Sequence, residues 1–228
     1  MSISEDGFVK FTGIILAAGL SSRMQAWKPG IIIKDRPVIY YTLSPMLSVC
    51  TQVVIVGGYK FNALTELFNC ADYLSEAQRK KIILTENSCY EKGMFSSVKS
   101  GLSLVDENSG GIFILPGDMP LVRTETYTKL IKCMENEADK DVIYPAVMTP
   151  DRQNPPEIRL KKGHPVLMRS RIRASVLKAD EGMILRDVLK SFNSGICTTD
   201  DQGICFDVDE ETDMKKAWDY IENKYPTL

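Results

Sequence analysis

Three segments of the sequence place charged or small residues directly after runs of apolar residues. The first reads LAAGLSSRM from residue 16 to residue 24 and is followed by Lys28, the second reads PGDMP and contains Asp118, and the third reads FDVD and contains Asp207 and Asp209. Ligands of open α/β sheets bind beyond the carboxyl ends of the strands, where such segments leave the sheet. We therefore expect the three segments to meet at one edge of a sheet and to form the functional site.

The first segment has the composition of an anion-binding loop. Small residues after a buried strand let backbone N–H groups approach an anion without a Cβ in the way, and Arg23 and Lys28 add a forked and a point-like positive charge. The chain has neither the GK[ST] of a Walker A motif nor a GxGxxG fingerprint, which argues against P-loop enzymes and dinucleotide-dependent oxidoreductases. A plain Gly/Ser turn with two solvated cations fits the same residues, so this segment alone does not decide the function.

The acidic residues of the other two segments are candidates for holding a divalent cation. Asp118 follows an apolar run at the edge where the first segment also emerges, and magnesium takes one or two carboxylates together with phosphate oxygens. Asp207 and Asp209 would lie on the same side of an extended segment, so either one can be the second ligand. The alternative interpretations are that Asp118 forms a turn and that Asp209 caps a helix.

Apolar runs of strand length alternate with amphipathic stretches of helix length, which predicts an α/β fold with three layers. The pattern predicts strands at residues 11–17, 31–33, 52–57, 81–85, 111–115, 141–147, 163–168 and 203–208. It predicts helices at residues 37–49, 61–78, 96–105 and 181–192, a C-terminal helix that ends near Tyr220, and a helix that Thr124 caps and that carries Tyr127, Leu130, Ile131 and Met134 on one face.

No internal repeat or interdomain linker interrupts the pattern. We therefore expect a single domain over residues 1–228, with an N-terminal extension at residues 1–10. Residues 149–163 are polar and contain two adjacent prolines, which predicts a loop excursion without regular structure.

Composition narrows the class of protein. The 28 basic and 30 acidic residues give a net charge of −2, which provides no basic face for a nucleic-acid duplex. No apolar run reaches the roughly 18 residues of a membrane span, and residues 1–10 lack the apolar core of a signal peptide, so we expect a cytoplasmic protein without a membrane partner.

The six cysteines form no CxxC pair and are expected to be buried free thiols. His164 is the single histidine, which disfavours zinc sites and histidine acid–base pairs.

Residues 16–28, LAAGLSSRMQAWK, resemble the signature LAAGxSxRMGxxK of the nucleotidyltransferases that activate phosphorylated small molecules. The chain is most similar to the molybdenum cofactor cytidylyltransferase branch, which is related to the guanylyltransferases for the same cofactor. Gln25 and Trp27 depart from the glycine and proline that are usual there. Further family motifs follow in order: N…GM..S between Asn87 and Ser97, L.GDxP between Leu115 and Pro120, GHP at Gly163-His164-Pro165, and DIDTPED at Asp207-Val208-Asp209 followed by Asp213.

The resemblance implies a Rossmann-like nucleotidyltransferase fold of the nucleotide-diphospho-sugar transferase type (GT-A-like), with a mostly parallel mixed sheet. It implies an enzyme in which an acceptor phosphate attacks the α-phosphorus of a nucleoside triphosphate and pyrophosphate leaves, with Mg²⁺ as the cofactor. CTP is favoured over GTP as the donor, and molybdopterin is favoured as the phosphorylated acceptor.

The resemblance also implies roles for individual residues. It assigns Arg23 and Lys28 to catalysis, and Asp118 with Asp207 or Asp209 to the metal. Gly163, His164 and Pro165 are expected on the acceptor side, although a histidine that only fixes the turn explains His164 equally well. The nucleotide is expected to contact Leu16, Ala17, Ala18, Gly19, Ser21, Ser22, Asn87, Gly93, Met94 and Ser97.

Two other functions fit parts of the pattern. A sugar-1-phosphate or phosphocholine-type nucleotidyltransferase would share the signature and differ in the acceptor pocket. A nucleotide-binding regulatory module that has lost turnover would explain Gln25 and Trp27 as drift. The joint presence of Arg23, Lys28 and Asp118 favours an active enzyme, because charges that are costly to crowd would be lost first in a module without turnover.

Overall fold

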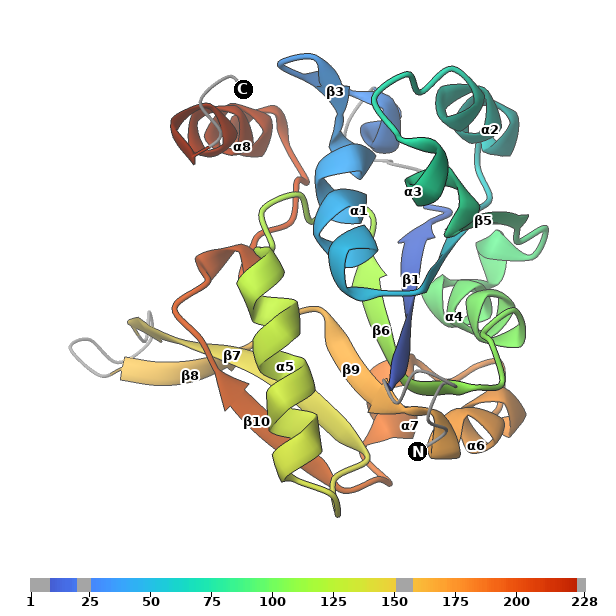
Figure 1. Ribbon diagram of the computed structural model, residues 1–228, viewed down its shortest axis with the longest axis vertical. Helices are drawn as coiled ribbons and strands as arrows, with labels where there is room; N and C mark the ends of the chain where they lie inside the picture. The colour runs from blue at the N-terminus through green and yellow to red at the C-terminus, as the bar shows by residue number, and fades with distance from the viewer. Residues whose placement is uncertain (1–8, 20–25, 151–157, 225–228) are drawn as a thin grey trace.

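The computed structural model describes residues 9–19, 26–150 and 158–224. Within these ranges an eight-stranded sheet has the strand order β10-β7-β9-β6-β1-β4-β5, and β8 pairs with β7 (Figure 1). Neighbours are parallel except where β9 pairs with β6 and β7 and where β8 pairs with β7. The strands are β1 (Lys10–Ala17), β4 (Gln52–Gly57), β5 (Ile82–Glu86), β6 (Ser109–Pro116), β7 (Val142–Pro150), β8 (Ile158–Lys162), β9 (Val166–Arg169) and β10 (Ser194–Thr198).

Helices cover both faces of the sheet, which confirms the predicted three-layer, mostly parallel α/β fold (Figure 1). A small two-stranded sheet, β2 (Ile32–Ile33) with β3 (Arg36–Pro37), leads into the first helix. The helices are α1 (Val38–Val49), α2 (Phe61–Asn69), α3 (Glu76–Lys80), α4 (Met94–Ser103), α5 (Thr124–Asn136), α6 (Arg173–Lys178), α7 (Leu185–Leu189) and α8 (Glu211–Lys224). None of the helices in the described ranges is long and apolar enough to span a bilayer.

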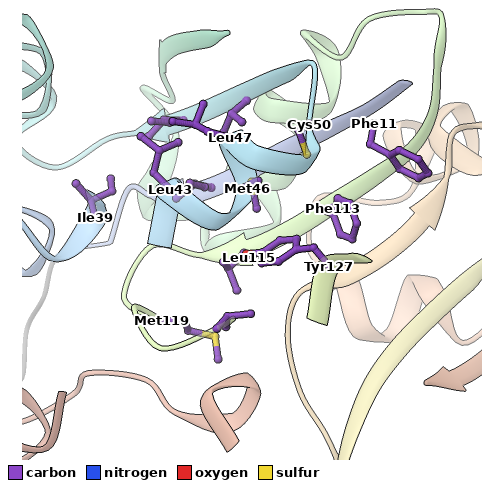
Figure 2. Packing of buried hydrophobic residues seen from close by; sticks show 14 of the residues in the cluster. Phe11, Ile39, Leu43, Met46, Leu47, Cys50, Phe113, Leu115, Met119 and Tyr127 are labelled. Atoms are coloured by element: carbon purple, nitrogen blue, oxygen red, sulfur yellow. The ribbon is translucent and has the colours of Figure 1, made fainter. Parts of the chain in front are cut away.

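The alternation of side chains along the central strands separates the core into two layers. Ile15 of β1 packs in the layer that contains α1 and α5, whereas its neighbour Ile14 packs in the layer that contains α4, α6 and α7. In the first layer the ring of Phe113 lies between Phe11 and Tyr127, with centroid distances of 5.8 and 5.2 Å (Figure 2). These buried apolar contacts hold β1 and β6, and therefore the loops that follow them, in fixed positions.

Two expected helices differ from the structure. The stretch predicted at 61–78 is divided into α2 and α3, and a reciprocal Ser75–Gln78 capping box begins α3. The helix predicted at 181–192 extends only over α7, because the Asp180 carboxylate accepts the Gly182 N–H and closes a turn ahead of it.

The strand predicted at 203–208 is also wrong. The Asp201 carboxylate accepts the Gly203 N–H at 3.0 Å, and residues 202–205 form a 3₁₀ turn instead. One of the strands that the sequence pattern missed is β10, which pairs with β7. Its alternate residues are exposed and it contains serine, glycine and threonine, so its apolar signal is weak.

The excursion expected at 149–163 contains regular structure. β7 continues to Pro150 and β8 returns antiparallel to it, from Ala146 opposite Lys162 to Pro150 opposite Ile158. The two strands form an arm at the side of the sheet (Figure 1), and residues 151–157 lie outside the described ranges.

The expectation of buried free thiols is corrected for most of the cysteines. Cys133 of α5 and Cys197 of β10 are joined in a disulfide, because the fold brings together two elements that are 64 residues apart. Cys70 and Cys89 are exposed, Cys205 is half-buried, and Cys50 alone is a buried free thiol.

Asp201 ties the N-terminus of α5 to the segment after β10. Its Oδ2 accepts the backbone N–H of Arg123 at 2.8 Å and the hydroxyl of Thr126 at 2.6 Å, and its side chain is fully buried. The helix therefore begins at Thr124 with Arg123 at its N-cap, rather than with Thr124 as the expected cap, and Asp201 anchors the Arg123 backbone N–H.

Replacing Asp201 with alanine is expected to lower the free energy of unfolding by about 3 kcal/mol, because it leaves several buried donors without an acceptor. Urea unfolding followed by circular dichroism measures the loss. Asp200→Ala is the matched control, since the exposed Asp200 carboxylate pairs with the same Arg123 and its removal should change stability little. Equal losses in the two variants would contradict this assignment.

Candidate active site

A cavity of about 440 Å³ opens beyond the carboxyl ends of β1 and β6. The two strands are parallel and in register up to the pair Leu16–Pro116, so the loops that follow them start at the same edge. The cavity is lined by Leu16, Ala17, Ala18, Gly19, Lys28, Pro29, Tyr90, Glu91, Gly93, Met94, Ser97, Pro116, Gly117, Asp118 and Asp209. The small-residue segment after β1 and the Asp118 segment after β6 therefore meet in this cavity, and Asp209 of the third segment also lines it.

Backbone hydrogen bonds fix the turn that carries Asp118. The Gly117 N–H donates to the Leu16 carbonyl at 2.9 Å, and the buried Thr42 hydroxyl of α1 donates to the Gly117 carbonyl at 3.1 Å. The Val208 N–H donates to the Asp118 carbonyl at 2.9 Å. The turn is therefore held from β1, from α1 and from the segment that leads to Asp209.

Lys28 lies between two carboxylates inside the cavity. Its Nζ is 2.7 Å from Asp209 Oδ1 and 3.3 Å from Asp118 Oδ2, and the lysine is 8% exposed. The residue begins a short 3₁₀ turn, Lys28–Gly30, whose Pro29 also lines the cavity. Three charged groups that are 90 and 181 residues apart in the chain thus form one cluster.

Burial raises the pKa of the Asp118 carboxyl above its usual value, because the ionised form loses hydration. The charge and the hydrogen bond of Lys28 act in the opposite direction, and the charge of Asp207 adds to the increase. The ionised form of Asp118 therefore depends on a cation close to it.

Asp209 rather than Asp207 joins the cluster. The two residues were expected on one side of a strand, but the segment is not a strand, and Asp207 is exposed and does not line the cavity. Asp213 holds the neighbouring backbone, since its Oδ2 accepts the N–H groups of Asp209 and Glu210 at 3.3 and 3.2 Å.

The Asp118–Asp209 pair fits a magnesium ion that is also bound by phosphate. Both carboxylates already face the Lys28 ammonium. No group of three or more His, Cys, Asp or Glu side chains suited to a metal occurs in the part of the chain that the structure describes. Two carboxylates without further protein ligands are the donor set of magnesium sites that phosphate oxygens and water complete.

Asn87 supports the wall of the cavity from behind. Its side chain is buried and donates to the Ser96 and Ser97 hydroxyls at 2.8 and 3.0 Å, while its oxygen accepts the Cys89 N–H at 3.0 Å. These bonds connect residues 87–89 to the first turn of α4. Asn87 itself does not line the cavity, although it was expected to contact a nucleotide.

Gly93 precedes α4 and lines the cavity with a φ of 102°, a left-handed conformation that strains any residue with a Cβ. Met94, which follows it, is 64% exposed and forms part of the cavity wall. Ser97 is buried and lines the cavity one turn further along α4.

A second cavity of about 750 Å³ adjoins the first. The two share Leu16, Gly93, Met94 and Pro116. The remaining walls of the larger cavity come mainly from β7, β8, the 163–166 segment and the 181–190 segment, together with Lys92, Phe95 of α4, Ile114 of β6 and Ser194 of β10. Ligands in the two cavities would therefore face each other across these four residues.

Gly163 and His164 line the larger cavity, and the Pro165 that follows them is buried beside it. A Cβ at Gly163 would lie 2.2 Å from the Ile204 carbonyl oxygen, so only glycine permits this close approach. Burial lowers the pKa of the His164 imidazole, opposed by a hydrogen bond to the Ile114 backbone and by the charge of Asp207. Burial therefore favours the neutral imidazole, and His164 both lines the cavity and contacts the backbone.

The predicted site residues and the residues that line the two cavities do not coincide completely. Ser21, Ser22 and Arg23 lie outside the described residues. The sequence analysis did not select Tyr90 and Glu91, although they lie between Asn87 and Ser97 in a motif that it recognised. It also did not select Tyr144 of β7 and Lys162 of β8, because no motif includes them.

Two curated proteins with similar sequences are cytidylyltransferases. The molybdenum cofactor cytidylyltransferase of Escherichia coli (strain K12) is 30% identical over 117 residues, which cover 51% of this chain and 56% of that protein. The 2-C-methyl-D-erythritol 4-phosphate cytidylyltransferase of Lachnoclostridium phytofermentans is 27% identical over 145 residues, 59% of each chain. The chain thus spans a little over half the length of these relatives.

Solved structures share the fold at low identity. CMP:2-keto-3-deoxy-manno-octonic acid synthetase complexed with CTP has a TM-score of 0.71 and 14% identity, covering 94% of this chain and 99% of that one. Rv0371c of Mycobacterium tuberculosis H37Rv in complex with manganese has a TM-score of 0.61 and 17% identity, covering 92% of this chain and 99% of that one. At these identities the comparison supports the fold alone, and it confirms the predicted nucleotidyltransferase architecture.

A family model describes most of the chain. It covers residues 13–196, which include both strand ends at the cavity, Lys28, Asp118 and the Gly163-His164-Pro165 turn. The chain therefore belongs to the family of MobA-like NTP transferase domains.

Proposed function

We propose that this protein is a magnesium-dependent cytidylyltransferase that transfers CMP from CTP to a phosphorylated acceptor, with molybdopterin as the favoured acceptor. The observation that carries the proposal is the cluster of Lys28, Asp118 and Asp209 at the boundary of two adjoining cavities. The name of the Escherichia coli relative supports both CTP and the molybdenum cofactor.

The chemistry matches the residues that are available. An oxygen of the acceptor phosphate attacks the α-phosphorus of CTP, a new P–O bond forms, and the bond to the pyrophosphate oxygen breaks. The attacking phosphate is already anionic near neutral pH, so no general base has to remove a proton. A chain with a single histidine can therefore supply what this reaction needs.

The protein has to position the two reacting phosphates and to neutralise the negative charge that develops on their oxygens. The backbone at Ala18 and Gly19 faces the triphosphate, and Lys28 binds an α-phosphate oxygen as negative charge develops on it. Arg23 is assigned to the β- and γ-phosphates together with Ser21 and Ser22. Magnesium, held by Asp118 and Asp209, would supply further neutralisation of phosphate oxygens.

The larger cavity suits the acceptor. The buried lining residues Ile114, Val166 and Leu189 are apolar, whereas four cationic side chains, Lys92, Lys162, Arg186 and Lys190, and the acidic Glu181 also line the cavity. The excess of positive charge favours an anionic molecule that packs partly against apolar side chains.

CTP with magnesium is expected to raise the midpoint of thermal unfolding more than GTP, UTP or ATP. A ligand at a hundred times its dissociation constant adds about 2.7 kcal/mol to the stability of the folded state. Pyrophosphate release from CTP is then measured with molybdopterin and, for comparison, with 2-C-methyl-D-erythritol 4-phosphate. A larger shift with GTP would indicate a guanylyltransferase, and a shift without pyrophosphate release would favour a nucleotide-binding module that has lost turnover. No shift with any nucleotide would contradict the proposal.

Single substitutions test the role of each residue in the charged cluster. Lys28→Ala, Asp118→Ala and Asp209→Asn are each expected to lower turnover by about 100-fold or more, because each removes charge stabilisation at the reacting phosphates. Asp207→Asn is the matched control and should keep turnover close to that of the wild type, since Asp207 is exposed and outside the cavity. Circular dichroism verifies folding. Near-normal turnover in Asp209→Asn with a loss in Asp207→Asn would reverse the assignment.

A further inference from the structure

Lys28 occupies the space in which a divalent cation would be bound. Its ammonium contacts one oxygen of Asp118 and one oxygen of Asp209, the two carboxylates that fit the metal. We propose that Lys28 is an internal counter-cation that the metal has to displace, so that the metal and the nucleotide bind cooperatively. This inference rests on the proposed function, because it takes the Asp118–Asp209 pair as the metal site.

The geometry allows one cation at a time between these oxygens. Nζ lies 2.7 Å from Asp209 Oδ1 and 3.3 Å from Asp118 Oδ2, and magnesium requires oxygen ligands at about 2.0–2.1 Å. A metal ion bound to the same two oxygens would fall within contact distance of the ammonium. Two positive charges at that separation in a partly buried site repel each other strongly.

A displaced Lys28 ammonium gives up its short contacts with Asp118 and Asp209. Lys28 is buried and its backbone belongs to the turn Lys28–Gly30, so the side chain has little freedom to reach bulk water. Giving up two short charged contacts in a partly buried position costs free energy. A nucleoside triphosphate brings phosphate oxygens into the same cavity, and these oxygens can replace the two carboxylates as partners of the ammonium. Nucleotide binding and metal binding therefore favour each other.

The cluster also explains how the nucleotide-free site tolerates two carboxylates at close range. Both face the same cavity, and Lys28 compensates their charge from between them. Removing the lysine charge should convert the pair into a site that attracts a divalent cation without any nucleotide. This consequence distinguishes a counter-cation from a lysine that only binds phosphate.

The test measures Mn²⁺ binding to the nucleotide-free protein through the loss of the electron paramagnetic resonance signal of free Mn²⁺. Lys28→Met, which keeps the length of the side chain, is expected to bind Mn²⁺ at least about tenfold more tightly than the wild type. The double variant K28M/D209N should lose this gain. In addition, Mn²⁺ alone should raise the midpoint of thermal unfolding of Lys28→Met, while the wild type should need Mn²⁺ and CTP together.

Lys92→Met is the control for net charge. Lys92 lines the adjoining cavity and pairs with Glu181 at 2.9 Å, so the variant removes the same charge without touching the carboxylate pair. Its affinity for Mn²⁺ should change by less than about twofold, because salt screens charges at the surface. Lys28→Gln is measured in the same way if Lys28→Met does not fold.

Mn²⁺ binding to the folded Lys28 variant that is no tighter than binding to the wild type, or a gain equal to that of Lys92→Met, would overturn the inference. The proposed function has a separate readout. If CTP with magnesium fails to stabilise the wild type, the proposed function fails, whereas the comparison of nucleotide-free variants still decides whether Lys28 competes with the metal.

Discussion

The parallel pairing of β1 with β6 is the constraint on which the site depends. The strands remain in register up to Leu16 and Pro116, so the small-residue loop and the Asp118 turn leave the sheet side by side. A hydrogen bond from the Gly117 N–H to the Leu16 carbonyl extends the pairing one residue beyond the strand end. The apolar packing of Phe113 against Phe11 and Tyr127 stabilises the same two strands beneath the site (Figure 2).

The charged cluster relies on this framework. An ammonium and two carboxylates can be partly buried together because each charge has an opposite charge at hydrogen-bond distance. Their positions are set by groups that do not face the cavity: Thr42 fixes the turn of Asp118, and Asp213 fixes the backbone of Asp209. Asn87 does the same for the opposite wall by bonding to Ser96 and Ser97. Small displacements of such groups would move charges relative to the phosphates, which matters in a reaction that depends on positioning.

The two adjoining cavities differ in the chemistry of their walls. The smaller one combines backbone groups, small residues and the charged cluster, as expected for a triphosphate. The larger one combines apolar side chains with cationic side chains from several elements, including the β8 arm. Under the proposed function, the acceptor could vary while the nucleotide chemistry stays constant, since most walls of the larger cavity come from segments other than the strand ends that carry the cluster.

The sequence by itself determined the fold class, the family and most of the candidate site. Apolar periodicity located β1, β4, β6 and α1 to within a few residues, because these buried elements have strong and regular patterns. Lys28, Asp118 and the Gly163-His164 turn were identified from short motifs, and each lines one of the cavities.

The tertiary structure decided the features that depend on contacts between segments far apart in the sequence. Asp209 rather than Asp207 faces Lys28 because residues 202–205 fold into a turn governed by the distant contacts of Asp201, not into a strand with alternating side chains. The pairing of Cys133 with Cys197 and the strand β10 likewise depend on contacts between distant segments. Such contacts override weak local propensity, because burial and hydrogen bonding contribute more free energy than the preference of a few residues for helix or strand.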